Sequence, residues 1–240
     1  MIKQLVLMAG GKGTRLGQVS KKIPKCLIKV NGIELIRHHL IFAKKNNLKR
    51  ILILTGYKHE YVKKYVNKLK LNNLDIKLIK DKCLLGTGFS LIKNLKYFEE
   101  TFLLVYADLY HSLNLKKFIE FHNSKNSDLT LVINKNNHPQ DSNLVKISKT
   151  KKIKKFYLYP HKNLSFKKLH TNEAIFLIKK FYLLNLDFNK KSKNIDFVKD
   201  ILPNNVNKIN MYGYHEKGNI VDCGDLKRIN YLEKLLKKTK

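Results

Sequence analysis

Near its start the chain carries Met8-Ala9-Gly10-Gly11-Lys12-Gly13-Thr14-Arg15-Leu16, and Pro24-Lys25 follows shortly afterwards. The apolar run that leads into this stretch, Gln4–Ala9, predicts a short buried strand. Glycines after a strand allow backbone N–H groups to approach a ligand closely and adopt positive φ angles. Free N–H groups beside a fixed cation suit a polyphosphate. The stretch therefore predicts a loop that holds nucleotide phosphates.

Two common phosphate-binding motifs are excluded by the spacing of these glycines. A dinucleotide-binding fingerprint that starts at Gly11 and Gly13 needs a third glycine where Leu16 stands. A P-loop ending in Gly11-Lys12 needs a glycine where Val6 stands, and a Ser or Thr where Gly13 stands. The loop belongs to another class of phosphate site.

The composition is that of an ordinary globular protein with a large positive charge. The chain has 240 residues, 43% of them hydrophobic, and a formal net charge of +31. No apolar run is long enough to span a membrane, and the first residues do not resemble a secretory signal, so we expect a cytoplasmic protein. The three cysteines are widely separated and odd in number, which favours neither disulfides nor a zinc site. Oligomeric state cannot be read from the sequence, so a homo-oligomer is left open.

The positive charge alone would favour a nucleic-acid or anionic partner. The lysines are spread over almost the whole chain, however, and no aromatic RNA-binding signature accompanies them. This distribution indicates a general bias in composition and makes nucleic acid an unfavoured partner. A positive field would still attract anionic nucleotides and sugar phosphates.

The first half of the chain alternates strand and helix patterns. Strands are expected at 4–9, 50–55, 74–80, 101–107 and 129–133, and helices at 34–46, 58–68, 86–95 and 115–125. This alternation predicts an α/β fold with a mostly parallel sheet flanked by helices. Ligands of such sheets bind beyond the carboxyl ends of the strands. We expect the loops 10–25, 56–58, 81–88 and 106–111 there.

The second half has a different pattern. It predicts a hairpin over 143–159, strands at 173–178, 209–214 and 220–221, a helix at 196–202 ended by Pro203, and a last helix at 226–238. No linker rich in Gly, Ser or Pro interrupts the chain. We therefore predict a single domain over 1–240, with a nucleotide-binding half at 1–135 and a sugar-phosphate-binding half at 136–240.

Two aspartates are candidate metal ligands by position. Asp108 ends the most apolar strand, and Asp222 ends a short apolar run before Gly224. Magnesium binds nucleotides through one or two carboxylates together with phosphate oxygens. Position alone leaves a second interpretation open for each residue, because either aspartate could cap or form a turn.

The combination Gly-Gly-x-Gly-Thr-Arg-Leu with a following Pro-Lys resembles the signature of the sugar-phosphate nucleotidyltransferases. The resemblance implies the fold of those enzymes, a Rossmann-like mostly parallel mixed sheet, and an EC 2.7.7 type of activity. It implies that Asp108 and Asp222 hold catalytic Mg²⁺, that Arg15 holds the β- and γ-phosphates, and that Lys25 holds the α-phosphate and the sugar phosphate. Arg15 and Lys25 are therefore the candidate catalytic cations. The residues expected to bind the nucleotide are Met8, Ala9, Gly10, Gly11, Gly13, Thr14, Arg15, Gly86 and Thr87.

Later segments resemble one group of these enzymes, the guanylyltransferases that act on D-glycero-D-manno-heptose 1-phosphate. The matching segments are 137–145, 159–161, 171–174, 195–197 and 212–214. By this resemblance, the residues expected near the sugar phosphate are Lys25, His138, Asp141, Asn172 and Glu173. Tyr159-Pro160 stands where the family often has Lys-Pro, and Lys162 is the candidate substitute for that lysine.

The sequence thus predicts an enzyme that transfers NMP from an NTP, GTP by resemblance, to a sugar 1-phosphate, a heptose 1-phosphate by resemblance. The products would be pyrophosphate and an NDP-sugar for surface polysaccharide synthesis. Hexose 1-phosphate with UTP or dTTP, and a small phosphorylated acceptor with CTP, remain alternatives. A non-catalytic nucleotide- or nucleic-acid-binding protein is the alternative from another class, although two metal carboxylates have little use in it.

Overall fold

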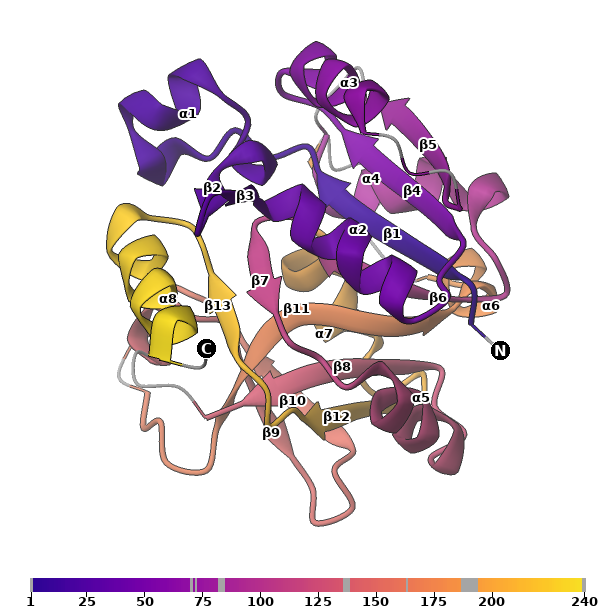
Figure 1. Ribbon diagram of the computed structural model, residues 1–240. Helices are drawn as coiled ribbons and strands as arrows, with labels where there is room; N and C mark the ends of the chain where they lie inside the picture. The colour runs from indigo at the N-terminus through magenta and orange to yellow at the C-terminus, as the bar shows by residue number, and fades with distance from the viewer. Residues whose placement is uncertain are drawn as a thin grey trace. The chain divides into compact units, whose positions relative to one another are not determined.

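The computed structural model describes residues 2–69, 71, 73–81, 85–135, 139–162, 164–186 and 194–238 (Figure 1). The chain divides into two compact units. The first unit contains residues 1–84, 105–112 and 219–240, and the second contains 85–104 and 113–218. Each unit therefore draws on segments that are far apart in the sequence. The predicted boundary between two halves at residue 135 stays a prediction.

The first unit is built on a parallel sheet. Its strands lie in the order β6-β1-β4-β5, with β1 at Gln4–Ala9, β4 at Arg50–Thr55 and β5 at Asp75–Lys80. Every residue of β1 is buried, and β1 pairs in parallel register with β4, which pairs in parallel with β5 (Figure 1). Strand β6, Thr101–Tyr106, carries the chain from the second unit into the first.

Helices and two small ladders complete the first unit. The helices are α1 (Gln18–Lys22), α2 (Leu35–Lys45), α3 (His59–Lys68) and α8 (Leu226–Lys238). One ladder pairs β2 (Lys29–Val30) with β3 (Ile33–Glu34), and the other pairs β7 (Leu109–His111) with β13 (Ile220–Asp222). Helices α2 and α8 bury apolar stripes of the kind their spacing predicts, with Leu40 of α2 and Leu232 of α8 fully buried.

The second unit contains the mixed part of the strand pairing. Its strands lie in the order β10-β9-β11-β6, and β8 pairs with both β11 and β12. The strands are β8 (Leu129–Asn134), β9 (Leu144–Ile147), β10 (Ile153–Tyr157), β11 (His170–Lys179) and β12 (Met211–His215). Strands β9 and β10 form the hairpin predicted over 143–159, and β8 runs antiparallel to β11 and parallel to β12.

The described part of the second unit also contains α-helices. They are α4 (Thr87–Lys93), α5 (Leu115–Ser124), α6 (Lys180–Leu184) and α7 (Leu202–Asn205). A wide π-helical turn, Phe197–Ile201, leads directly into α7. The predicted stop at Pro203 is wrong, because Pro203 lies in the first turn of α7, where its missing N–H group is not needed.

The predicted fold class is confirmed: the protein is α/β, with a mixed, mostly parallel sheet and helices packed on it. The expected loop at 106–111 is partly wrong, since Leu109–His111 forms β7 with alternating deeper and shallower burial. Within the described part of the chain, no helix has both the length and the apolar character needed to cross a membrane.

Candidate functional site

The glycine loop after β1 is fixed at both ends of its turn. The carbonyl of Gly10 accepts a hydrogen bond from the N–H of Tyr57 at 3.2 Å, so the loop is tied to the end of β4. Gly13 has a φ of +65°, and a Cβ there would lie 3.3 Å from the Cβ of Lys25. A side chain at this position would therefore be both strained and crowded, which explains why the loop needs glycine at Gly13.

The short 3₁₀ turn Thr14–Leu16 contains a buried apolar residue, Leu16, next to an exposed cation, Arg15. Leu16 is buried in an apolar cluster with Val30, Leu35, Cys223 and Leu232. Arg15, the residue before it, has a side chain that is 59% exposed. Its guanidinium can therefore change partners without disturbing the core.

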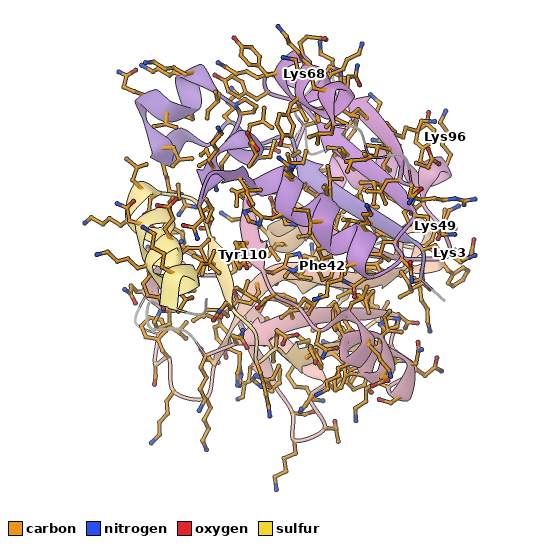
Figure 2. All side chains as sticks on the ribbon, in the orientation of Figure 1. Lys3, Phe42, Lys49, Lys68, Lys96 and Tyr110 are labelled. Atoms are coloured by element: carbon orange, nitrogen blue, oxygen red, sulfur yellow. The ribbon has the colours of Figure 1, made fainter. Side chains whose placement is uncertain are left out.

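Lys25 differs from most lysines of the chain. The labelled lysines Lys3, Lys49 and Lys68 lie exposed at the surface (Figure 2), whereas only 10% of the Lys25 side chain is exposed. Pro24 is extended, with φ −66° and ψ 146°, and precedes the 3₁₀ turn that begins at Lys25. A lysine is almost never buried without a charged partner, so the surroundings of Lys25 are informative.

The ammonium of Lys25 contacts two carboxylates. Its Nζ donates to Oδ2 of Asp108 in a short hydrogen bond, and it lies 3.4 Å from Oδ1 of Asp222. Burial disfavours the charged ammonium, but the charges of Asp108 and Asp222 outweigh burial and raise the pKa of Lys25. The lysine is therefore a charged bridge between the two aspartates.

The ladder of β7 and β13 brings the two aspartates together. Asp222 is the last residue of β13 and pairs with Leu109 of β7. Leu109 directly follows Asp108 in the chain. The N–H of Cys223 also donates to the carbonyl of Asp108 at 2.9 Å. Residues more than a hundred positions apart in the chain thus present their carboxylates side by side.

Asp222 is the most heavily paired carboxylate of this cluster. Its Oδ2 accepts from Arg228 at 2.7 Å and lies 3.3 Å from the guanidinium of Arg15, while its Oδ1 faces Lys25. Burial favours the neutral acid, yet the charges of Lys25, Arg15 and Arg228 together keep the pKa of Asp222 below its usual value. Two carboxylates and three cations therefore form one network, which we call the charge cluster: Arg15, Lys25, Asp108, Asp222 and Arg228.

The charge cluster fits a divalent metal ion. Within the described part of the chain, no group of three or more His, Cys, Asp and Glu side chains is arranged so that it could hold a metal ion by itself. Magnesium at a nucleotide site needs only one or two carboxylates, because substrate phosphates and water complete its shell. Asp108 and Asp222 already share a single cationic partner, the ammonium of Lys25, which stands in for an ion between them.

The structure places the predicted residues Met8, Ala9, Gly10, Gly11, Gly13, Thr14, Arg15, Lys25, Asp108 and Asp222 in the first unit, and it joins Arg15, Lys25, Asp108 and Asp222 directly. Met8 and Ala9 are the buried end of β1. The roles assigned to these residues stay predictions.

Gly86 and Thr87 lie in the second unit at the start of α4. Gly86 has a φ of +92°, and a Cβ on it would lie 2.3 Å from the carbonyl oxygen of Ile195. The Thr87 hydroxyl donates to Asp196 at 3.1 Å and accepts from the N–H of Phe197 at 2.9 Å. These contacts join α4 to the π-helical turn.

Of the residues expected near the sugar phosphate, Lys25 lies in the first unit, whereas Asp141, Lys162, Asn172 and Glu173 lie on three connected segments of the second unit. Asn143 joins them: its side chain accepts from the N–H of Tyr159 at 3.0 Å, and its carbonyl accepts from the N–H of Asn172 at 3.0 Å. Asp141 is exposed on the first segment and Lys162 on the second. His138 lies outside the described residues.

Asn172 and Glu173 lie at an irregularity in β11. The pairing of β11 with β8 shifts register between Asn172 and Phe176, and Ala174 adopts a φ of +52°. The Asn172 side chain accepts from the N–H of Ala174 at 3.0 Å, and Glu173 accepts from the Thr171 hydroxyl at 2.6 Å. Bulges of this kind often redirect side chains beside binding sites.

Sequence reasoning missed Arg228. It stands six residues after Asp222 on the first turn of the last helix, and its main-chain N–H donates to Oδ1 of Asp225 at 2.9 Å. The pattern Asp225-x-x-Arg228 at a helix start is visible in the sequence and would have indicated a capping residue. Its contact with Asp222 is a tertiary feature that the pattern does not contain.

Comparisons with known proteins agree with this architecture. The D-glycero-alpha-D-manno-heptose 1-phosphate guanylyltransferase of Campylobacter jejuni is 29% identical over 114 residues, which cover 48% of this chain and 51% of that protein. The enzyme of the same name from Aneurinibacillus thermoaerophilus is 27% identical over 131 residues, covering 54% and 56%. The matches thus span about half the length of these curated relatives.

The solved structure of HddC from Yersinia pseudotuberculosis has the same fold. It superimposes with a TM-score of 0.80 at 22% identity and covers 98% of this chain and 100% of its own. The same protein is also solved complexed with GMP-PN. A family profile described as Nucleotidyl transferase matches residues 4–238. The chain belongs to the nucleotidyl transferase family.

Proposed function

We propose that this protein transfers a nucleoside monophosphate from an NTP to a sugar 1-phosphate and releases pyrophosphate. The observation that carries the proposal is the charge cluster, in which one buried lysine bridges two carboxylates beside a glycine loop. A nucleotide-binding module without catalysis has no need for two carboxylates held beside a displaceable cation. Family membership supports the same class of reaction.

The favoured substrates are GTP and D-glycero-D-manno-heptose 1-phosphate. This choice is supported by the names of two curated relatives and by the GMP-PN complex of HddC. It is a finer proposal than the reaction class, because the matched segments cover only about half of those relatives. The residues proposed to contact the sugar phosphate are Lys25, His138, Asp141, Lys162, Asn172 and Glu173.

The reaction needs positioning and charge neutralisation more than proton transfer. An oxygen of the sugar 1-phosphate attacks the α-phosphorus of the NTP in line, the new P–O bond forms, and the bond to the β-phosphate oxygen breaks. The attacking phosphate is already ionised, so no general base is required. The leaving pyrophosphate carries away the electron pair of the broken bond.

Lys25 and Arg15 supply the cations for this step. Lys25 is buried and points at the carboxylates, so it can move its charge toward the α-phosphate over a short distance. Arg15 is exposed and planar, which suits the β- and γ-phosphates. Preorganised charges of this kind stabilise the transition state without solvent rearrangement.

Asp108 and Asp222 would hold the divalent ion that members of this family generally use, and we propose that it is Mg²⁺. When bound, magnesium neutralises charge on the phosphate oxygens of the substrate. The contribution of the chain is to hold Asp222 beside Asp108 and to keep Asp222 ionised, because the charges of Lys25, Arg15 and Arg228 lower its pKa.

A pyrophosphate-release screen tests the reaction. Four NTPs are combined with a panel of sugar 1-phosphates that includes heptose, glucose and mannose 1-phosphate, in the presence of Mg²⁺. Release with GTP and heptose 1-phosphate alone is the expected result. Release with UTP, dTTP or CTP and another acceptor would replace the substrates and keep the reaction, and no release from any pair would overturn the proposal.

Asp108→Asn is the matched inactive variant for this screen. Loss of one carboxylate charge should reduce turnover by at least about 100-fold while the thermal midpoint stays near that of the wild type. Asp75→Asn, the same charge change at an exposed position of β5, should leave turnover unchanged. Near-normal turnover of Asp108→Asn would remove Asp108 from the proposed site.

A further inference from the structure

The two oxygens of the Asp222 carboxylate have different partners. Oδ1 lies 3.4 Å from the ammonium of Lys25, which also contacts Asp108. Oδ2 accepts from the guanidinium of Arg228 at 2.7 Å. Oδ1 is therefore linked to Asp108 through the ammonium of Lys25, whereas Oδ2 is held by the guanidinium of Arg228.

Arg228 and Arg15 both reach Oδ2, but they differ in rigidity. Arg15 lies on the loop, with a 59% exposed side chain 3.3 Å from Oδ2. Arg228 is only 19% exposed and makes the shorter contact. Arg15 is free to turn toward substrate phosphate, whereas Arg228 stays with the carboxylate.

Arg228 is itself held by Asp225. Its Nε lies 3.3 Å from Oδ2 of Asp225, and its main-chain N–H donates to Oδ1 of the same residue. The following residue of α8, Ile229, is buried in the apolar cluster together with Leu232. The guanidinium is therefore fixed between two carboxylates on a helix that is anchored in the core.

Gly224 limits where the Asp222 carboxylate can lie. A Cβ at Gly224 would be 2.9 Å from both Oδ1 and Oδ2 of Asp222, so the carboxylate occupies the space that a side chain would fill. The backbone on one side and Arg228 on the other therefore define a single orientation. Partners that orient metal-binding carboxylates contribute strongly to metal affinity.

We infer that Arg228 is a positioning residue, which holds Asp222 by Oδ2 so that Oδ1 is presented to the metal site shared with Asp108. Asp225 supports this role by fixing the guanidinium. The inference rests on the proposed function, since it takes Asp222 as a ligand of the divalent ion.

Metal binding tests the inference apart from turnover. Mn²⁺ is titrated into the nucleotide-free protein and into the protein with GMP-PNP, and free Mn²⁺ is followed by its EPR signal. Arg228→Gln should weaken Mn²⁺ binding about 10- to 100-fold. Arg228→Lys, which keeps the charge but cannot contact both aspartates in the same way, should recover part of that loss.

Lys227→Gln is the control for charge. It removes one positive charge from the neighbouring, exposed position of the same helix and should leave Mn²⁺ binding unchanged. If Arg228→Gln binds Mn²⁺ as tightly as the wild type, or more tightly, Arg228 is a counter-charge only and the inference is overturned. Asp225→Asn, which keeps the guanidinium but loosens it, should also weaken Mn²⁺ binding relative to the wild type. If Arg228→Gln does not fold, wild-type Mn²⁺ affinity in Asp225→Asn overturns the inference.

The two proposals fail in different ways. An inactive wild type with normal Mn²⁺ binding, lost in Arg228→Gln, would overturn the proposed reaction and leave the inference intact. An active wild type whose Mg²⁺ requirement is the same in Arg228→Gln, with Mn²⁺ binding also unaffected, would overturn the inference alone.

Discussion

Gly224 is a position at which even a small side chain would disturb the charge cluster. Its backbone lies outside the left-handed region, so an alanine would fit the main chain. The new Cβ would nevertheless meet Asp222 oxygens at 2.9 Å and the Arg15 guanidinium at 2.8 Å. These atoms are side-chain ends, which can move, so the cost falls on the site and not on the fold.

We therefore expect Gly224→Ala to fold normally and to lose activity. A displacement of Asp222 by a fraction of an ångström to one ångström should lower kcat roughly 10- to 100-fold. The thermal midpoint and the pyrophosphate-release rate are measured on the same preparation. Wild-type turnover in this variant would show that the orientation of Asp222 does not matter.

At the residue scale, the sequence predicted which side chains would meet but not how they are held. The alternation of strands and helices predicts the glycine loop and Asp108 at one end of the sheet, and the resemblance to the sugar-phosphate nucleotidyltransferases adds Lys25 and Asp222 to that region. The contact of Arg228 with Asp222 depends on which side of α8 faces the site, and local spacing does not encode that.

At the scale of elements, the short ladder of β7 and β13 was only half predicted. The run Ile220-Val221 was recognised as a strand, but its partner Leu109–His111 was expected to be a loop. A strand of three residues has too few alternations for its period to be recognised, and its stability comes from the partner strand. This ladder is nevertheless what places the two carboxylates side by side.

Gly86 supports an element of the second unit and gives the sharpest stability prediction. The backbone φ at this position is +92°, and a Cβ here would lie 2.3 Å from the main-chain carbonyl oxygen of Ile195. That oxygen cannot move without shifting the backbone of residues 194–197. Gly86→Ala should lower the free energy of unfolding by roughly 2 to 4 kcal/mol.

Urea denaturation measures this loss, with Gly17→Ala as the control. Gly17 also has a positive φ, +55°, but open space around its Cβ position. Its alanine variant should cost about 1 to 3 kcal/mol, the backbone term alone, and less than Gly86→Ala. Equal losses in the two variants would contradict the steric explanation for Gly86.

At the scale of the whole molecule, buried histidines make the free energy of unfolding depend on pH. Burial lowers the pKa of His111 to about 4, and burial followed by the charge of Lys179 lowers that of His122 to about 4. Burial also lowers the pKa of His39, with His111 and His38 adding to the effect. One or more of these histidines lies in each unit.

The direction of the change in stability with pH follows from the difference in proton binding between the folded and unfolded states. The unfolded histidines, with a pKa near 6.5, bind protons before the folded ones do, so stability is complete above about pH 6.5 and is lost as the pH falls toward 4. His111 and His122 should each contribute roughly 3 kcal/mol to this loss. Thermal midpoints between pH 7.5 and 4.5 measure it.

His111→Phe separates this effect from general acid instability. The His111 ring lies 4.6 Å from Phe42 and 5.2 Å from His39, and neither of its nitrogens has a hydrogen-bond partner within the described part of the molecule (Phe42 is labelled in Figure 2). A phenylalanine should therefore pack there and reduce the slope of the thermal midpoint against pH. An unchanged slope would show that His111 does not titrate with unfolding.

The fold of the whole molecule was largely predictable because the strand and helix periods alternate clearly. The mispredicted helix end at Pro203 occurs where a wide turn leads directly into a short helix. The net charge of +31 does not help to predict the fold or the site, because most lysines are exposed whereas Lys25, the lysine of the charge cluster, is buried.

The bridge made by Lys25 has a thermodynamic consequence. Two adjacent carboxylates with no counter-ion would repel each other, but here an ammonium already compensates them, so a chelator should leave the thermal midpoint of the nucleotide-free protein unchanged. Under the proposed function, a divalent ion bound by Asp108 and Asp222 exchanges with that ammonium, and the released ammonium gains a new anion only when nucleotide phosphate is present. Ion and nucleotide therefore favour each other's binding, by one and the same factor in both directions. Without nucleotide, the ammonium of Lys25 therefore competes with the divalent ion for the two carboxylates.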